Sequence, residues 1–136
     1  MKKGAFAIAL LLAVIASNSW AQTADSISVT RLAICAEVKD REPVGEATSF
    51  DPAIATLYCF TELNGAAGQV VHAWLQGDSL RSEVKLNKGN AGRWRTWSAK
   101  TMPANWTGTW RVEVRDDSGK VLKSATFSSS APKAEQ

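Results

Sequence analysis

The sequence contains few of the residues on which metal and thiol chemistry depends. Its 136 residues include a single histidine, His72, and two cysteines, Cys35 and Cys59. Zinc hydrolases usually need two or three imidazole ligands, so one histidine argues against that class of enzyme. The cysteines do not form a CxxC motif, which argues against thiol redox catalysis. We therefore expect no metal and no cofactor.

Long apolar runs are also lacking. The run at residues 5–16 is shorter than the ~20 residues that a membrane-spanning helix needs. Lys2 and Lys3 precede this run, and the small residues Ser19 and Ala21 follow it, which together predict a signal peptide over residues 1–21 and a mature chain from Gln22. We expect a periplasmic or secreted protein with no stable membrane insertion after cleavage.

Strong net charge is absent as well. Removal of residues 1–21 leaves 115 residues, enough for one domain with a modest core. Lys2 and Lys3 leave with the signal peptide, so the formal charge falls from +3 to +1. Such a small charge does not indicate a nucleic-acid partner.

The two cysteines remain in the mature chain. An exported protein meets an oxidising environment, so parity and compartment favour a disulfide between Cys35 and Cys59. The other interpretation is that they are two small core residues in neighbouring strands that never bond.

Secondary structure is expected to be entirely β. No segment has a sustained helical period, and turn-forming residues divide the chain into runs rich in Val, Thr and Trp. The predicted strands are residues 29–38, 54–63, 69–76, 79–86, 93–100, 108–115 and 120–128, with a loop at 39–52. Seven short strands predict an immunoglobulin-like antiparallel β-sandwich over residues 22–128, followed by a disordered tail at 129–136.

Two hairpins are predicted from their turns. A two-residue turn at Gly77 and Asp78 would place Leu75 opposite Leu80, on the core side. In that register the outer side pairs Trp74 with Arg81, and His72 with Glu83. In the second hairpin Gly119 takes a left-handed conformation, with Trp110, Val112 and Val114 inward and Arg111, Glu113 and Arg115 outward.

The strand at residues 93–100 carries a candidate contact surface. Alternation places Arg93, Arg95 and Trp97 on one face, and Trp94 on the other. An exposed tryptophan among arginines is typical of binding surfaces and can stack on sugars while the arginines bind anions. The second possibility is that Trp97 is covered and the arginines only solvate the sheet. The candidate binding residues are Arg93, Arg95, Trp97, His72, Trp74 and Arg81.

Four motifs occur in one order along the chain. They are residues 35–43 (CAEVKDREP), 57–61 (LYCFT), 93–100 (RWRTWSAK) and 106–114 (WTGTWRVEV). Together they resemble the bacterial family catalogued as domain of unknown function 2914, over nearly the whole mature chain. The resemblance implies a small β-rich domain and supplies no mechanism.

Three functional classes follow from these observations. The leading prediction is a non-enzymatic binding module whose Trp and Arg side chains hold an anionic glycan or an envelope partner protein. The second is a structural or assembly component that docks onto an envelope complex through a sheet edge or the loop at Pro43. The third, weaker one is hydrolysis of an envelope component by Asp40, Glu42 and His72.

Overall fold

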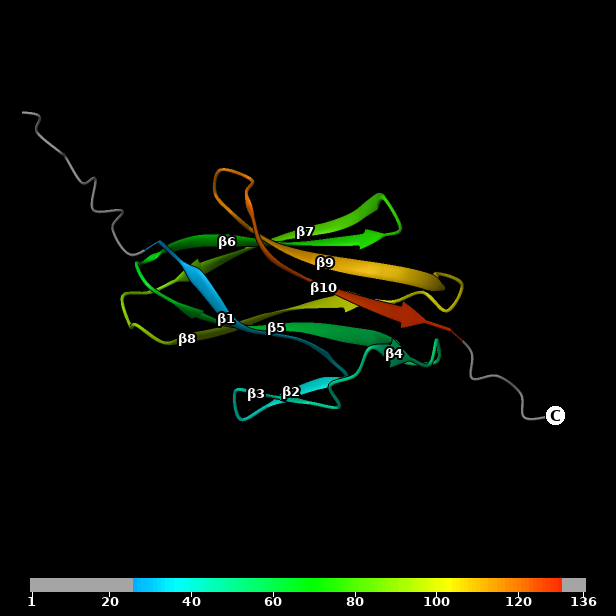
Figure 1. Ribbon diagram of the computed structural model, residues 1–136. Helices are drawn as coiled ribbons and strands as arrows, with labels where there is room; N and C mark the ends of the chain where they lie inside the picture. Colours follow the sequence, from blue (N-terminus) through cyan, green and yellow to red (C-terminus); the bar gives the residue numbers. More distant parts are fainter. Residues whose placement is uncertain (1–25, 131–136) are drawn as a thin grey trace, which may run out of the picture.

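The computed structural model describes residues 26–130, which form two stacked β-sheets and a small hairpin (Figure 1). The predicted signal peptide and residues 131–136 of the predicted tail lie outside this range. The strands are β1 (Ser28–Cys35), β2 (Glu37–Lys39), β3 (Glu42–Val44), β4 (Ser49–Phe50), β5 (Thr56–Asn64), β6 (Gly68–Gln76), β7 (Ser79–Lys88), β8 (Trp94–Thr101), β9 (Gly108–Asp116) and β10 (Val121–Ser129). No helix in this range is long and apolar enough to cross a membrane.

The predicted immunoglobulin-like sandwich is confirmed. One sheet has the order β1-β5-β8 and the other the order β4-β10-β9-β6-β7, with β4 parallel to β10 and the remaining pairs antiparallel. Each of the seven predicted strands is present. The first is shorter than predicted because β1 ends at Cys35, and Ser129, assigned to the tail, is buried at the end of β10.

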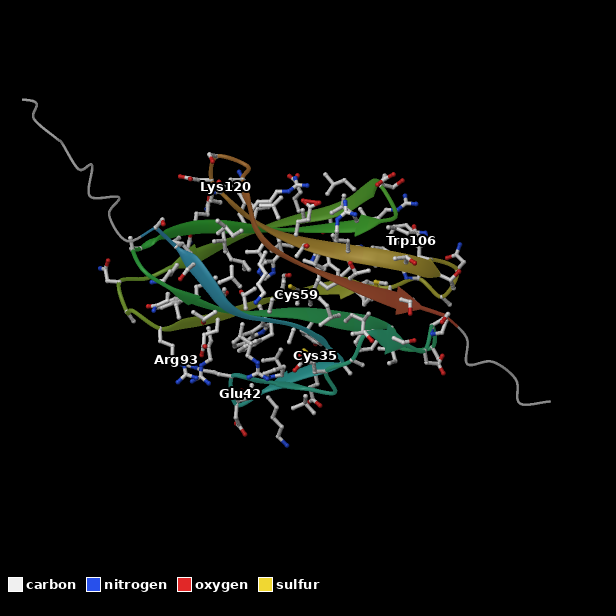
Figure 2. The ribbon with its side chains drawn as sticks, viewed as in Figure 1. Cys35, Glu42, Cys59, Arg93, Trp106 and Lys120 are labelled. Carbon is white, nitrogen blue, oxygen red and sulfur yellow. The ribbon has the colours of Figure 1, made fainter. Side chains whose placement is uncertain are left out.

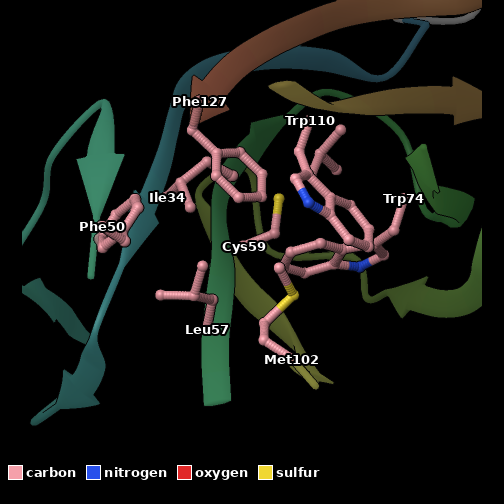
Figure 3. Close-up of a cluster of buried hydrophobic side chains, with 9 residues drawn as sticks. Ile34, Phe50, Leu57, Cys59, Trp74, Met102, Trp110 and Phe127 are labelled. Atoms are coloured by element: carbon pink, nitrogen blue, oxygen red, sulfur yellow. The ribbon is translucent and has the colours of Figure 1, made fainter. Parts of the chain in front are cut away.

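The main core fills the space between the two sheets (Figure 3). Trp110 and Trp74 are fully buried there, and Phe127 stacks on Trp110 with ring centroids 6.1 Å apart. Val112 and Val114 are buried on the same face of β9, which confirms the predicted alternation of that strand. Burial of such large apolar side chains is the main stabilising contribution to the fold.

The loop predicted at residues 39–52 contains structure. β2 and β3 form a hairpin against the outer face of the β1-β5-β8 sheet, and β4 adds a short edge strand to the other sheet (Figure 1). Beneath the hairpin lies a second small core, in which Ala33, Cys35 and Phe60 are buried and Val38 is partly buried.

The β6–β7 hairpin has the predicted turn but the wrong predicted faces. Leu75 pairs with Leu80, as expected, and Gly77 has a positive φ of 57°. A β-bulge at Arg81 of β7 then shifts the β6–β7 register by one residue, so Trp74 pairs with Ser82. β6 itself alternates without interruption against β9, where His72 pairs with Val114 and Trp74 with Val112. Because these two valines are buried on the core face of β9, Trp74 and His72 also face the core.

The predicted disulfide is wrong. Cys35 pairs with Tyr58, and Cys59 pairs with Ile34, so the two cysteines are one position out of register on adjacent strands. Neighbouring register positions project to opposite faces of a sheet. Cys59 therefore lies in the main core, whereas Cys35 lies beneath the β2–β3 hairpin, and both are free and buried (Figure 2).

We expect two reactive thiols per chain when the protein is labelled under denaturing, non-reducing conditions. Because no bond links Cys35 to Cys59, a reducing agent should leave the melting temperature unchanged. A removed native disulfide would instead cost about 2–5 kcal/mol. Intact mass after labelling is the measurement, and a chain lacking both adducts would contradict the sheet register.

Candidate functional site

The predicted face of β8 lies on the outer surface of the β1-β5-β8 sheet. Trp97 pairs with Phe60, and Arg95 pairs with Glu62, so these side chains share one face. Trp97 is 37% exposed, and its indole stacks on the buried Phe60 ring with an interplanar angle of 14°. One face of the indole is thus supported by the second small core. The other is available for contact.

A hollow of about 350 Å³ lies beside Trp97. We call it the arginine cleft, and it is lined by Arg41, Ala91, Arg93, Trp94, Arg95 and Trp97. Its volume is at the low end of the range of about 300–1,000 Å³ that is typical of small-molecule sites. The cleft suits a single ring-sized group.

Two carboxylates hold the arginines of the cleft in place. Arg95 donates to Glu42 Oε1 at 2.5 Å and to the backbone oxygen of Arg41 at 3.2 Å. Arg93 donates to Glu62, and this hydrogen bond, with a second from Thr30, holds the pKa of the Glu62 carboxyl below its ordinary value. The guanidiniums are therefore oriented before any ligand arrives.

Arg41 comes from the tip of the β2–β3 hairpin. Asp40 and Arg41 form its two-residue turn, and both have positive φ, 52° and 61°. A left-handed conformation costs a residue other than glycine roughly 1–2 kcal/mol. Such strain is frequent at functional sites. Within residues 26–130, Arg41 forms no ion pair, so it gives the cleft its uncompensated positive charge.

The structure separates the six predicted binding residues. Arg93, Arg95 and Trp97 lie together, as predicted. His72 and Trp74 are fully buried between the sheets, and the prediction of exposed positions for them is wrong because they lie beside Val114 and Val112 on the core face of the β6–β9 pair.

Arg81 lies elsewhere too, with its guanidinium carbon 4.6 Å from the ring centroid of Trp106. It does not contact Trp74 as the predicted register required.

His72 belongs to a buried polar network. Its Nδ1 is 2.7 Å from Ser98 Oγ, and its Nε2 is 3.3 Å from Thr61 Oγ1. Trp74 donates its indole N–H to Ser98 Oγ, and Thr61 donates its hydroxyl proton to the backbone oxygen of Thr96. Thr61 can then only accept from His72, so the proton resides on Nε2 and Ser98 donates to Nδ1.

This network satisfies a neutral imidazole, and it has no access to solvent. Burial lowers the pKa of His72 to about 4. His72 and Ser98 resemble a base and nucleophile by distance, but they are 0% and 4% exposed. Glu42 lies on the other side of the sheet, at the β2–β3 hairpin. The residues of the predicted hydrolase site therefore do not converge.

Two further sequence features have structural explanations. Asp116 Oδ1 accepts hydrogen bonds from the Ser118 amide, the Ser118 hydroxyl and the Lys120 amide, so it stabilises the β9–β10 turn. Within residues 26–130, no group of three or more His, Cys, Asp or Glu side chains is placed to hold a metal ion.

Sequence reasoning missed the contribution of residues 40–42 to the cleft. The segment 37–44 alternates as a hairpin would, but its turn is Asp-Arg and not the Asn-Gly or Asp-Gly that signals a two-residue turn. Alternation was therefore the one feature of the sequence that could have predicted this hairpin.

Two solved structures resemble this chain distantly. A mutant β-glucosidase from Listeria innocua in complex with laminaribiose aligns with a TM-score of 0.47 and 9% identity, over 77% of this chain and 16% of the enzyme. A β-glucosidase from Bifidobacterium adolescentis aligns with a TM-score of 0.45 and 10% identity, over 82% of this chain and 19% of the enzyme. This chain thus spans less than a fifth of either enzyme. No curated protein matches it.

A protein-family model matches residues 67–128, and its description is "Protein of unknown function (DUF2914)". The match includes two of the four motifs, at residues 93–100 and 106–114, whereas those at 35–43 and 57–61 precede it. The predicted resemblance to this family of unknown function is therefore confirmed over residues 67–128, which is less of the mature chain than was expected.

Proposed function

We propose that this protein is an exported, non-enzymatic binding module of the periplasm or extracellular space, and that its arginine cleft binds an anionic glycan of the cell envelope. The observation that carries the proposal is the arrangement of the cleft, where a supported, partly exposed Trp97 adjoins oriented guanidiniums. An aromatic face provides the surface on which the apolar face of a sugar ring stacks, and the arginines donate to its oxygens.

The charges of the cleft suggest which sugar it would take. Arg41, Arg93 and Arg95 line the cleft, and Arg31 shares Glu42 with Arg95, so four positive charges lie there. Three negative charges offset them, on Glu42, Glu46 and Glu62. The remainder is one positive charge within a space that suits one ring. A hexuronic acid unit, with one carboxylate per ring, matches both the charge and the size.

A screen of carboxylated and neutral oligosaccharides against the purified mature protein tests this proposal. We expect carboxylated glycans to be retained, and Trp97→Ala to weaken their binding by about 1–3 kcal/mol, as loss of an aromatic anchor does. Arg41→Gly should also weaken binding while relieving the strain of the left-handed turn. Calorimetric titration of each variant gives the affinities.

Val121→Ala is the matched control, because Val121 is a 45% exposed apolar residue outside the cleft. It should bind as the unmodified protein does. If no glycan is retained, or if Trp97→Ala binds with unchanged affinity, the cleft is not a glycan site. Recovery of an envelope protein by crosslinking would then favour the assembly role.

A further inference from the structure

A second group of basic and aromatic side chains lies at the opposite end of the sandwich from Arg93 (Figure 2). We call it the Trp106 platform, and it consists of Trp106, Arg81 and Lys100. These residues come from the β8–β9 loop, β7 and β8, and none of them lines the arginine cleft.

Arg81 is held in a fixed orientation on this platform. Its Nε and Nη2 atoms both donate to Gln76 Oε1, at 3.1 and 2.9 Å, and Gln76 in turn donates to the backbone oxygen of Thr107 at 2.9 Å. Among the described residues, Arg81 Nη1 has no hydrogen-bond partner. The outer part of the guanidinium fork is thus oriented and free to donate.

Lys100 brings a second positive charge to the same ring. Its Nζ is 5.1 Å from the Trp106 ring centroid and donates to the backbone oxygen of Thr101 at 3.3 Å. Within residues 26–130, neither Arg81 nor Lys100 has a carboxylate within 4.0 Å. Arg93 and Arg95 of the cleft, by contrast, are each paired with a glutamate.

The indole ring of Trp106 contacts both cations. Trp106 is half-buried and packs on Trp110, with ring centroids 6.0 Å apart. The ring attracts each cation, and no carboxylate in the described part of the chain neutralises either one. Arg81 lies over the ring, so this tryptophan does not offer an open face to a sugar, in contrast to Trp97.

From this geometry we propose that the Trp106 platform is a binding site for an oxyanion group, a carboxylate or a phosphate. The anion would accept from the free edge of the Arg81 guanidinium and from the Lys100 ammonium, forming charge-assisted hydrogen bonds with two cations that have no carboxylate partner. This site goes beyond the function proposed for the arginine cleft and does not depend on it.

The test follows the indole N–H resonance of Trp106 in the mature protein, assigned with Trp106→Phe, by NMR at constant ionic strength. Inorganic phosphate, acetate and trigalacturonate are added in separate titrations. We expect a saturable shift with at least one probe. Tight binding of phosphate would identify a free anion, whereas binding of trigalacturonate well above acetate would identify a carboxylate carried by a glycan.

Arg81→Gln should raise the dissociation constant at least about tenfold, which corresponds to 1.4 kcal/mol. The matched control is Lys85→Gln, because Lys85 is an exposed cation of the same strand without an ion pair in the described part of the chain. This control should change the constant less than twofold. Shifts that stay linear for every probe, or equal weakening by both variants, would overturn the site and leave the arginine cleft untouched.

Discussion

Replacement of Trp110 by alanine should lower the free energy of unfolding by about 3–5 kcal/mol, the range for truncation of a buried aromatic residue. Trp110 is fully buried, stacks on Phe127 and donates its indole N–H to the backbone oxygen of Trp106 at 3.2 Å. Its removal leaves a cavity in the main core and one unsatisfied carbonyl. Urea denaturation of the purified variant measures the loss, and the melting temperature should fall by roughly 12 °C or more.

The loss of stability in Trp110→Ala should be compared with that in Trp97→Ala. Trp97 is 37% exposed, and only one of its faces packs, on Phe60. We expect its truncation to cost less than about 1.5 kcal/mol, because a surface position leaves little cavity. A Trp97→Ala protein that melts as early as Trp110→Ala would place Trp97 in the core, and the arginine cleft would lose its aromatic surface.

Acidification from pH 7 to pH 5 should destabilise the protein by about 2 kcal/mol through His72 alone. Burial lowers the pKa of this imidazole to about 4 from the ordinary 6.5. The unfolded chain therefore binds a proton near pH 6.5 that the folded chain rejects until about pH 4. The stabilising contribution is complete above pH 6.5 and is lost as the pH falls through this window.

The hydrogen bonds of His72 also predict that the folded state loses stability as the pH falls. A charged imidazole must donate from both nitrogens, but Ser98 Oγ already accepts from the Trp74 indole and would have to stop donating. The carboxyls with lowered pKa, Glu62, Glu113 and Asp116, start from ordinary values between 3.8 and 4.5. Their contributions are lost below that range, so the interval between pH 7 and pH 5 isolates the histidine.

Chemical denaturation at several pH values measures this slope, and His72→Gln is the control. The glutamine variant has no titrating group at this position and should show a flat profile between pH 7 and pH 5. If it fails to fold, the pKa of His72 can be read directly from the imidazole resonances of the unmodified protein. A histidine that titrates near 6.5 in the folded state would contradict the buried network.

The strands were predictable because period-two alternation is written in the sequence. Trp110, Val112 and Val114 of β9 follow it without interruption, and their burial agrees with the prediction. The faces of β6 were not predictable by the same reasoning. Ala73, Trp74 and Leu75 are all buried, so the hydrophobic pattern of β6 does not distinguish its core face from its outer face. The extra residue Arg81 in β7 also shifts the register that the turn alone predicts.

The candidate site was also predictable only in part. Alternation along β8 placed Arg93, Arg95 and Trp97 on one face, and the structure agrees. The contribution of Arg41 depends on a hairpin turn in which a residue other than glycine adopts a left-handed conformation. Tertiary contacts such as the one from Arg95 to the Arg41 carbonyl stabilise that turn, and local sequence patterns do not encode them.

Because the two thiols lie on opposite faces of one sheet, their alkylation rates in the native protein report on two different opening motions. Cys35 is covered by the β2–β3 hairpin, so its rate of alkylation in the native protein measures how often that hairpin lifts from the sheet. Cys59 lies between the sheets, and its rate measures how often the sandwich itself opens. A ligand in the arginine cleft, which includes the hairpin tip, would lower the alkylation rate of Cys35 more than that of Cys59.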